Sequence, residues 1–248
     1  MRRLVKFLAL VVAAPALVVG LAAGAAEGED PITVYAAASL TEVFPKIATD
    51  PRFQFAGSNQ LAVQIRQGAP ADVFASASPV YTQALSKEGL IERPRVFATN
   101  TLVLAVPRSN PAKLTSVADL AKRPKLRLVV AGPKVPVGLY TRQVLQRLGL
   151  LRVLRNTVSQ EADVKGIVGK LALGEADAGF VYVTDVNASS GRLTAIPIPK
   201  RGQPSVRYEL AVVARTKHMD AAWSFVADVL GASGRRELAR AGFGLPKP

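Results

Sequence analysis

The sequence predicts an α/β fold built around mostly parallel β-sheet. Two observations carry this prediction. Short apolar, β-branched runs alternate along the chain with amphipathic segments of helical period, and glycines follow several of those segments as stop signals. Strands separated by helices of this length form parallel-rich sheets with helices on both faces. In such sheets ligands bind beyond the carboxyl ends of strands, next to helix N-termini.

Each predicted element has a local signal. The run ITVYAA at residues 32–37 is apolar and β-branched, which favours a strand. Leu40, Val43, Phe44 and Ile47 then recur at helical spacing. The predicted strands cover residues 32–37, 53–55, 72–75, 101–106, 126–131, 178–183, 193–197 and 208–213. The predicted helices cover residues 40–47, 59–67, 78–87, 116–121, 137–148, 163–173, 220–230 and 235–241.

The start of the chain has the pattern of an export signal. Three basic residues precede an apolar run at residues 7–21, and a small-x-small cleavage motif follows at residues 23–25. We expect a signal peptide over residues 1–25 and a soluble, periplasmic mature protein, with an uncleaved membrane anchor as the alternative. No cysteine follows the apolar run, which excludes a lipoprotein anchor.

Composition excludes several classes of protein. With 49% hydrophobic and 20% charged residues, the chain is expected to fold. The absence of cysteine and the single histidine exclude thiolate catalysis, cysteine-ligated metals and multi-histidine sites. The net charge of +14 is spread thinly, with no basic stripe interleaved with aromatics, so we expect no nucleic-acid partner. Hydrolase, metalloprotease and nucleotide-binding motifs are missing, which predicts a protein that is not an enzyme.

Four predicted strand-to-helix turns share one feature: small or hydroxyl residues lead the chain into a helix. They are Ala37-Ala38-Ser39, Ala56-Gly57-Ser58, Pro136-Val137-Gly138 and Ala162-Asp163-Val164. A helix N-terminus has unpaired backbone N–H groups and a partial positive charge. Several such ends meeting at one point would bind an anion without any arginine or lysine.

Each of these residues also has a purely structural interpretation. Ser39 and Ser58 are ordinary candidates for helix N-caps. Tyr182 is of a type that often packs in a core with a hydrated hydroxyl. Lys165 is expected on the solvated surface.

Seven segments together resemble the periplasmic molybdate-binding proteins of ABC importers. The resemblance runs from about residue 32 to residue 246, which is nearly the whole predicted mature chain. The segments are YAAASL (35–40), FAGSNQLA (55–62), GAPADVFASA (68–77), VPVGLY (135–140), DVKG (163–166), GFVY (179–182) and GFGLP (242–246).

The resemblance implies a type II periplasmic-binding-protein fold. In that fold two α/β lobes, each a mixed, mostly parallel sheet with flanking helices, are joined by two crossing strands and close on the ligand. We expect the first lobe at residues 31–106 plus 209–248 and the second at residues 107–208. The predicted strands at 101–106 and 208–213 are the candidate crossovers.

The resemblance also implies the ligand and the residues that bind it. The ligand is molybdate or tungstate, a tetrahedral oxyanion held only by neutral donors, with no bond from protein to molybdenum and no cofactor. Hydroxyl and backbone N–H groups come from Ser39 and Ser58, backbone N–H groups from Val137 and Val164, and a phenolic hydroxyl from Tyr182. An ABC permease is the implied partner, and we expect a monomer.

The sequence departs from the family pattern in places. Gly57 and Asn59 flank Ser58 where relatives often carry serine or threonine, and Val137 stands where a smaller residue is common. Asp163 fits an N-cap better than a metal ligand, so tetrahedral coordination is expected. Sulfate remains the alternative ligand, because it is as fully ionised as molybdate and only cavity size separates the two. Phosphate fits less well, since its proton needs an acceptor and the matched positions offer donors.

Overall fold

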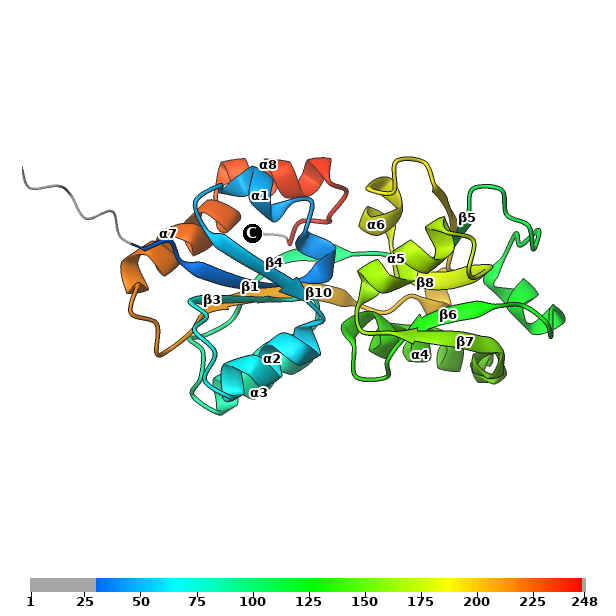
Figure 1. The fold of residues 1–248 in the computed structure, drawn as a ribbon, viewed down its shortest axis with the longest axis horizontal. Helices are drawn as coiled ribbons and strands as arrows, with labels where there is room; N and C mark the ends of the chain where they lie inside the picture. Colours follow the sequence, from blue (N-terminus) through cyan, green and yellow to red (C-terminus); the bar gives the residue numbers. More distant parts are fainter. Residues whose placement is uncertain (1–29, 247–248) are drawn as a thin grey trace, which may run out of the picture. The chain divides into compact units, whose positions relative to one another are not determined.

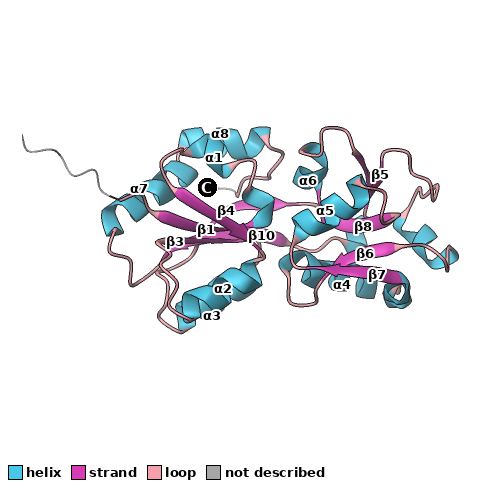
Figure 2. Cartoon of the chain, viewed as in Figure 1, coloured by secondary structure: helices cyan, strands magenta, loops and turns pink. Residues whose placement is uncertain are grey.

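The computed structural model describes residues 30–246, so the predicted signal peptide at residues 1–25 lies outside the described residues. Within residues 30–246 ten strands form two five-stranded sheets with helices beside them (Figures 1 and 2). The strands are β1 (Thr33–Ala37), β2 (Arg52–Ala56), β3 (Val73–Ser76), β4 (Arg95–Asn100), β5 (Leu102–Pro107), β6 (Leu128–Ala131), β7 (Thr157–Glu161), β8 (Ala178–Tyr182), β9 (Leu193–Pro197) and β10 (Val206–Val212). No helix in this span is long and apolar enough to cross a bilayer.

Helices and short 3-10 turns connect the strands. The α-helices are α1 (Phe44–Ile47), α2 (Ser58–Arg66), α3 (Pro79–Lys87), α4 (Pro136–Arg147), α5 (Val164–Ala172), α6 (Val183–Asn187), α7 (Met219–Leu230) and α8 (Ala232–Arg240). The 3-10 turns are η1 (Ala38–Leu40), η2 (Val117–Lys122), η3 (Leu151–Asn156) and η4 (Lys200–Gly202). The alternation of strands and helices confirms the predicted α/β class.

The two sheets share one plan. The first has the order β2-β1-β3-β10-β4, in which β1 pairs in parallel with β2 and β3, and β10 is antiparallel to β3 and β4. The second has the order β7-β6-β8-β5-β9, in which β6 pairs in parallel with β7 and β8, and β5 is antiparallel to β8 and β9. Each sheet therefore has three parallel strands whose carboxyl ends lie at one edge.

The chain passes between the sheets twice. It leaves the first sheet after β4 and enters the second at β5, and it returns between β9 and β10. The strand predicted at residues 101–106 therefore belongs to the second sheet, whereas the predicted lobe boundary placed it in the first lobe. A division by sheets falls near residue 101. The division into two moving lobes stays a prediction.

The sequence-based prediction missed two strands and did not anticipate a break in one helix, each for an identifiable reason. It also missed the short helix α6, and the helix predicted at residues 116–121 is the 3-10 turn η2. β4 and β7 were not predicted, because both lie at sheet edges and carry polar residues that obscure the strand pattern. The helix predicted at residues 40–47 divides into η1 and α1. Pro45 explains the break, since it is the second residue of α1 and its ring would clash with the carbonyl of Thr41 in a continuous helix.

Aromatic packing anchors the helices that cover the first sheet. Phe44 of α1 is fully buried and contacts Phe53, Phe97 and Phe225, with ring centroids 6.1, 5.8 and 5.6 Å away. These rings come from β2, β4 and α7, so one side chain joins two strands and two helices. Truncating a buried phenylalanine costs about 3–5 kcal/mol of stability. This packing fixes α1 and α7 against the first sheet.

Candidate functional site

All five residues implied by the resemblance line one pocket. Its walls are formed by small residues at the carboxyl ends of strands and the starts of helices. They are Ala37, Ala38, Ser39, Ala56, Gly57, Ser58, Ala77, Val135, Pro136, Val137, Asp163, Val164 and Tyr182. Segments of both sheets contribute, so the pocket lies where the two sets of strand ends meet.

The positions around the pocket follow the shared sheet plan. Ser39 follows β1, the middle of the three parallel strands in its sheet, and Ser58 follows β2. In the second sheet Val137 follows β6, again the middle parallel strand, and Val164 follows β7. Tyr182 is the last residue of β8. Parallel strands bring their carboxyl ends to one edge, which is why residues far apart in sequence meet here.

Three helices begin at the pocket. α2 begins at Ser58, α4 at Pro136 and α5 at Val164. Proline at the first position of α4 has no N–H, so the Val137 N–H is the first that this helix offers. In α5 the Asp163 carboxylate accepts from the N–H groups of the second and third residues, at 2.8 and 3.2 Å, which leaves the Val164 N–H outside the cap. The predicted N-cap role of Asp163 is confirmed.

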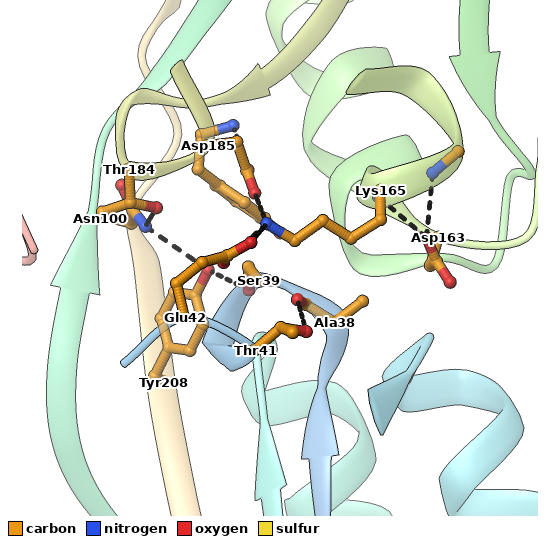
Figure 3. Close-up of polar contacts among 12 residues, drawn as sticks. Ala38, Ser39, Thr41, Glu42, Asn100, Asp163, Lys165, Thr184, Asp185 and Tyr208 are labelled. Atoms are coloured by element: carbon orange, nitrogen blue, oxygen red, sulfur yellow. Dashed lines mark hydrogen bonds and ion pairs between the residues drawn. The ribbon is translucent and has the colours of Figure 1, made fainter. Parts of the chain in front are cut away.

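The two serines do not cap their helices, so the capping interpretation is wrong for both. Ser58 is fully buried, and its Oγ accepts a hydrogen bond from the Ala77 N–H at 3.1 Å. Ser39 Oγ lies 2.9 Å from the hydroxyl of Tyr208, which accepts a longer bond from Asn100 Nδ2 at 3.4 Å (Figure 3). Each serine is thus held by a partner from another strand or its loop.

Tyr182 has a hydroxyl with no partner. Its side chain is 2% exposed, and its hydroxyl oxygen is buried without a hydrogen bond inside the protein. Leaving a buried polar group unsatisfied costs about 1–3 kcal/mol, so such groups commonly have a ligand or water. Burial raises the pKa of Tyr182 well above its ordinary value, which keeps the hydroxyl protonated and able to donate.

Lys165 was predicted on the solvated surface, but it is only partly exposed and is paired with two carboxylates. Its side chain is 27% exposed, and its Nζ lies 2.7 Å from Glu42 Oε2 and 3.3 Å from Asp185 Oδ1 (Figure 3). Asp185 is 2% exposed and accepts a hydrogen bond from the Tyr182 N–H at 3.1 Å. Burial raises the pKa of Asp185 to about 6, although Lys165 acts in the opposite direction.

Segments of the two sheets approach closely around the pocket. Tyr140 of α4 donates to the carbonyl of Ala77 at 3.3 Å. At Gly57 a Cβ atom would lie 2.6 Å from the carbonyl oxygen of Ala162, which is closer than real contacts allow. The glycine that departs from the family pattern therefore permits this approach.

The pocket offers hydrogen-bond donors and small apolar walls. Among residues 30–246 no group of three histidine, cysteine or acidic side chains is placed to hold a metal cation. Helix N-termini, serine hydroxyls and a neutral tyrosine can instead surround an anion. Sequence reasoning did not find Tyr208, Asn100, Glu42 or Asp185. The first three contact partners that are distant in the chain, and the burial of Asp185 cannot be read from its neighbours in the sequence.

Comparison with known proteins places the chain in a family. The family model described as bacterial extracellular solute-binding protein matches residues 32–244. The molybdate-binding protein of Mycobacterium tuberculosis is 41% identical over 234 residues, covering 90% of this chain and 88% of the relative.

Two solved structures show the same fold. The periplasmic molybdate-binding protein of Azotobacter vinelandii matches with a TM-score of 0.75 at 23% identity, covering 87% of this chain and all of that one. The sulfate-binding protein SubI of Mycobacterium tuberculosis matches with a TM-score of 0.76 at 16% identity, covering 88% of each chain. The fold is therefore that of the type II periplasmic binding proteins, as predicted, and the chain belongs to the family of bacterial extracellular solute-binding proteins.

Proposed function

We propose that this protein captures molybdate outside the cytoplasm and delivers it to the permease of an ABC importer. The observation that carries the proposal is the buried hydroxyl of Tyr182, which has no partner in the protein and lines a pocket of neutral donors. Its relative in Mycobacterium tuberculosis, 41% identical, is a molybdate-binding protein. The protein acts as a receptor and not as an enzyme.

Five residues bind the oxyanion in this proposal. Ser39, Ser58 and Tyr182 donate from hydroxyl groups, and Val137 and Val164 donate from the backbone. All contacts go to oxygen atoms, so molybdenum or tungsten forms no bond with the protein, and no cofactor is required. Neutral donors can neutralise the anion because the helix N-termini add partial positive charge.

Several further features belong to the same proposal. The protein is exported by the segment at residues 1–25, acts as a periplasmic monomer and also binds tungstate. Its two lobes close on the ligand, with the boundary near residue 101 as the sheets divide the chain. The permease then receives the ligand from the closed form.

Titration calorimetry with molybdate, tungstate, sulfate and phosphate tests the ligand, with thermal melting as the second measurement. A ligand that binds only the folded state stabilises it by about 4 kcal/mol at a thousandfold excess over Kd, which corresponds to a rise of roughly 10 °C for a chain of this size. We expect this shift with molybdate and a much smaller one with sulfate and phosphate. Equal shifts with molybdate and sulfate would favour a general receptor for ionised oxyanions.

A further inference from the structure

Three charged side chains meet beside the pocket (Figure 3). Lys165 Nζ contacts both carboxylate oxygens of Glu42, at 2.7 and 2.8 Å, and lies 3.3 Å from Asp185 Oδ1. Glu42 follows β1 of the first sheet, whereas Lys165 and Asp185 lie on α5 and α6, which belong with the second sheet. We call these three residues the ion cluster.

Each member of the ion cluster is linked to a residue that the proposed function uses. Glu42 comes three residues after Ser39, in the turns between η1 and α1. Lys165 directly follows Val164 at the start of α5. Asp185 accepts from the backbone N–H of Tyr182 at 3.1 Å. The cluster therefore links three of the five residues that the proposed function uses: Ser39, Val164 and Tyr182.

The two contacts of Lys165 differ in kind. Asp185 is 2% exposed, and a buried carboxylate needs a partner of opposite charge. Its contact with Lys165 lies within the second-sheet side and does not depend on how the two sides meet. Glu42 is 46% exposed at its side chain and loses little by returning to water. Of the two contacts of Lys165, only the one with Glu42 joins the two sides of the pocket and has to break if they separate.

We propose that Lys165 is a positioning residue that, held by Asp185 and paired with Glu42, keeps the pocket closed and slows ligand release. This inference rests on the proposed function. The pair adds no contact to the anion. It acts by holding the strand ends and helix starts of the two sheets close together around the ligand.

The geometry also limits the size of the effect. Exposed ion pairs contribute little to stability, and this pair is only partly buried. Loss of a contact made only in the closed form acts on dissociation more than on association. Removing the Glu42 charge should therefore speed release by roughly 1.5- to fivefold, with the difference shrinking at high salt.

Stopped-flow measurement of release tests the inference, with molybdate as the probe or sulfate if calorimetry shows that sulfate is the ion that binds. Glu42→Gln and Lys165→Gln should each release the probe faster. The double variant should release it no faster than Lys165→Gln, because Lys165→Gln already removes the contact with Glu42 as well as the contact with Asp185. Lys165→Arg should restore slow release. Association rates should stay within about twofold of the parent rate.

A matched control lies on the same helix. Lys170 of α5 pairs with Glu175 at 2.5 Å, and both belong with the second sheet, so this pair does not join the two sides of the pocket. Lys170→Gln should release the probe at the parent rate. Parent-like release from Glu42→Gln, or equally fast release from Lys170→Gln, would overturn the inference. Failure of the parent protein to bind molybdate contradicts the proposed ligand instead, so the two failures are distinguishable.

Discussion

The two sides of the pocket supply their donors in different ways. The first-sheet side uses hydroxyls of Ser39 and Ser58 that already have protein partners, Tyr208 and the Ala77 N–H. The second-sheet side uses backbone N–H groups at helix starts and the hydroxyl of Tyr182, which has no partner. The serines are thus held by hydrogen bonds within the protein, whereas the Tyr182 hydroxyl would gain a partner only from the proposed ligand.

The hydrogen bonds within the protein indicate which hydrogen of a side chain remains free to donate to a ligand. Ser58 Oγ accepts from a backbone N–H, so its own hydrogen is free to donate into the pocket. Preset donors lower the cost of ordering the site when the ligand binds. The Tyr182 hydroxyl has no partner in the protein and would gain one only from the bound ligand. In the proposed site, closure of the pocket and binding of the ligand therefore depend on each other.

The largest effect should come from removing one hydroxyl on each side. Losing a hydrogen bond to a charged oxyanion costs about 1.5–3 kcal/mol, or roughly ten- to a hundredfold in affinity. Ser58→Ala and Tyr182→Phe should each lower molybdate affinity by this amount in calorimetry. The double variant should lose at least about a hundredfold and fail to compact with ligand in small-angle scattering.

The two single variants should differ in ligand-free stability. Ser58→Ala leaves the Ala77 N–H without its acceptor and should melt earlier, whereas Tyr182→Phe removes a hydroxyl that has no partner and should melt at or above the parent temperature. Parent-like affinity in both variants would show that the site is elsewhere.

The second prediction concerns Asp185, which accepts a hydrogen bond from the backbone N–H of Tyr182. Burial raises its pKa from 3.8 to about 6, so the folded state holds this proton more tightly than the unfolded state. Its contribution to stability is therefore full below about pH 4 and is lost as pH rises through 6, by on the order of 3 kcal/mol. The stability of the parent relative to Asp185→Asn should rise by up to this amount between pH 7 and pH 4 in urea unfolding.

Asp119 gives a control of opposite sign. Hydrogen bonds, first from the Thr115 N–H, hold the pKa of Asp119 well below its ordinary value. Its contribution is present above the unfolded pKa and is lost as pH falls, so the stability of the parent relative to Asp119→Asn should fall toward low pH. Matching trends in the two variants would mean that the Asp185 slope has another origin.

The sequence predicted the parts of the fold that depend on local pattern. Buried strands such as β3 and β5 carry continuous apolar runs, and Asp163 caps α5 as its position indicated. The edge strands β4 and β7 escaped because exposure on one side mixes polar residues into the pattern. Pro45 divided a helix whose apolar period alone looked continuous.

The pocket could be predicted only in part, and for a physical reason. Its lining residues lie at strand-to-helix turns, which local signals identify. Local signals do not identify the residues that form hydrogen bonds or ion pairs with this part of the protein. Tyr208 is 169 positions from its partner Ser39, and Glu42 is 123 positions from its partner Lys165. Lys165 itself was expected in solvent, because nothing in one sequence reveals that a buried carboxylate lies beside it.

A third prediction tests whether the first-sheet side depends on the partner of Ser39. Tyr208 is fully buried, and its hydroxyl contacts both Ser39 Oγ and Asn100 Nδ2. Tyr208→Phe keeps the ring but leaves Ser39 without its partner, so the serine hydroxyl can rotate away from the ligand. We expect molybdate affinity to fall by about threefold to tenfold, as for the net contribution of one neutral hydrogen bond. An unchanged affinity in calorimetry would mean that Ser39 needs no partner to bind the ligand.

The smallest effect on binding should come from the two valines whose backbone N–H groups are the proposed donors. Val137 and Val164 are both buried, at 1% and 4% exposure, and their proposed donors are N–H groups that alanine also has. Replacing either by alanine removes two methylene-sized groups from the core and should lower stability by about 2 kcal/mol. Molybdate affinity should change by less than about threefold, because the donor and the helix start are unchanged. Val129→Ala is the control, since Val129 is fully buried in β6 and does not line the pocket. If Val137→Ala loses affinity much more than Val129→Ala at similar melting temperature, the valine side chain itself shapes the site.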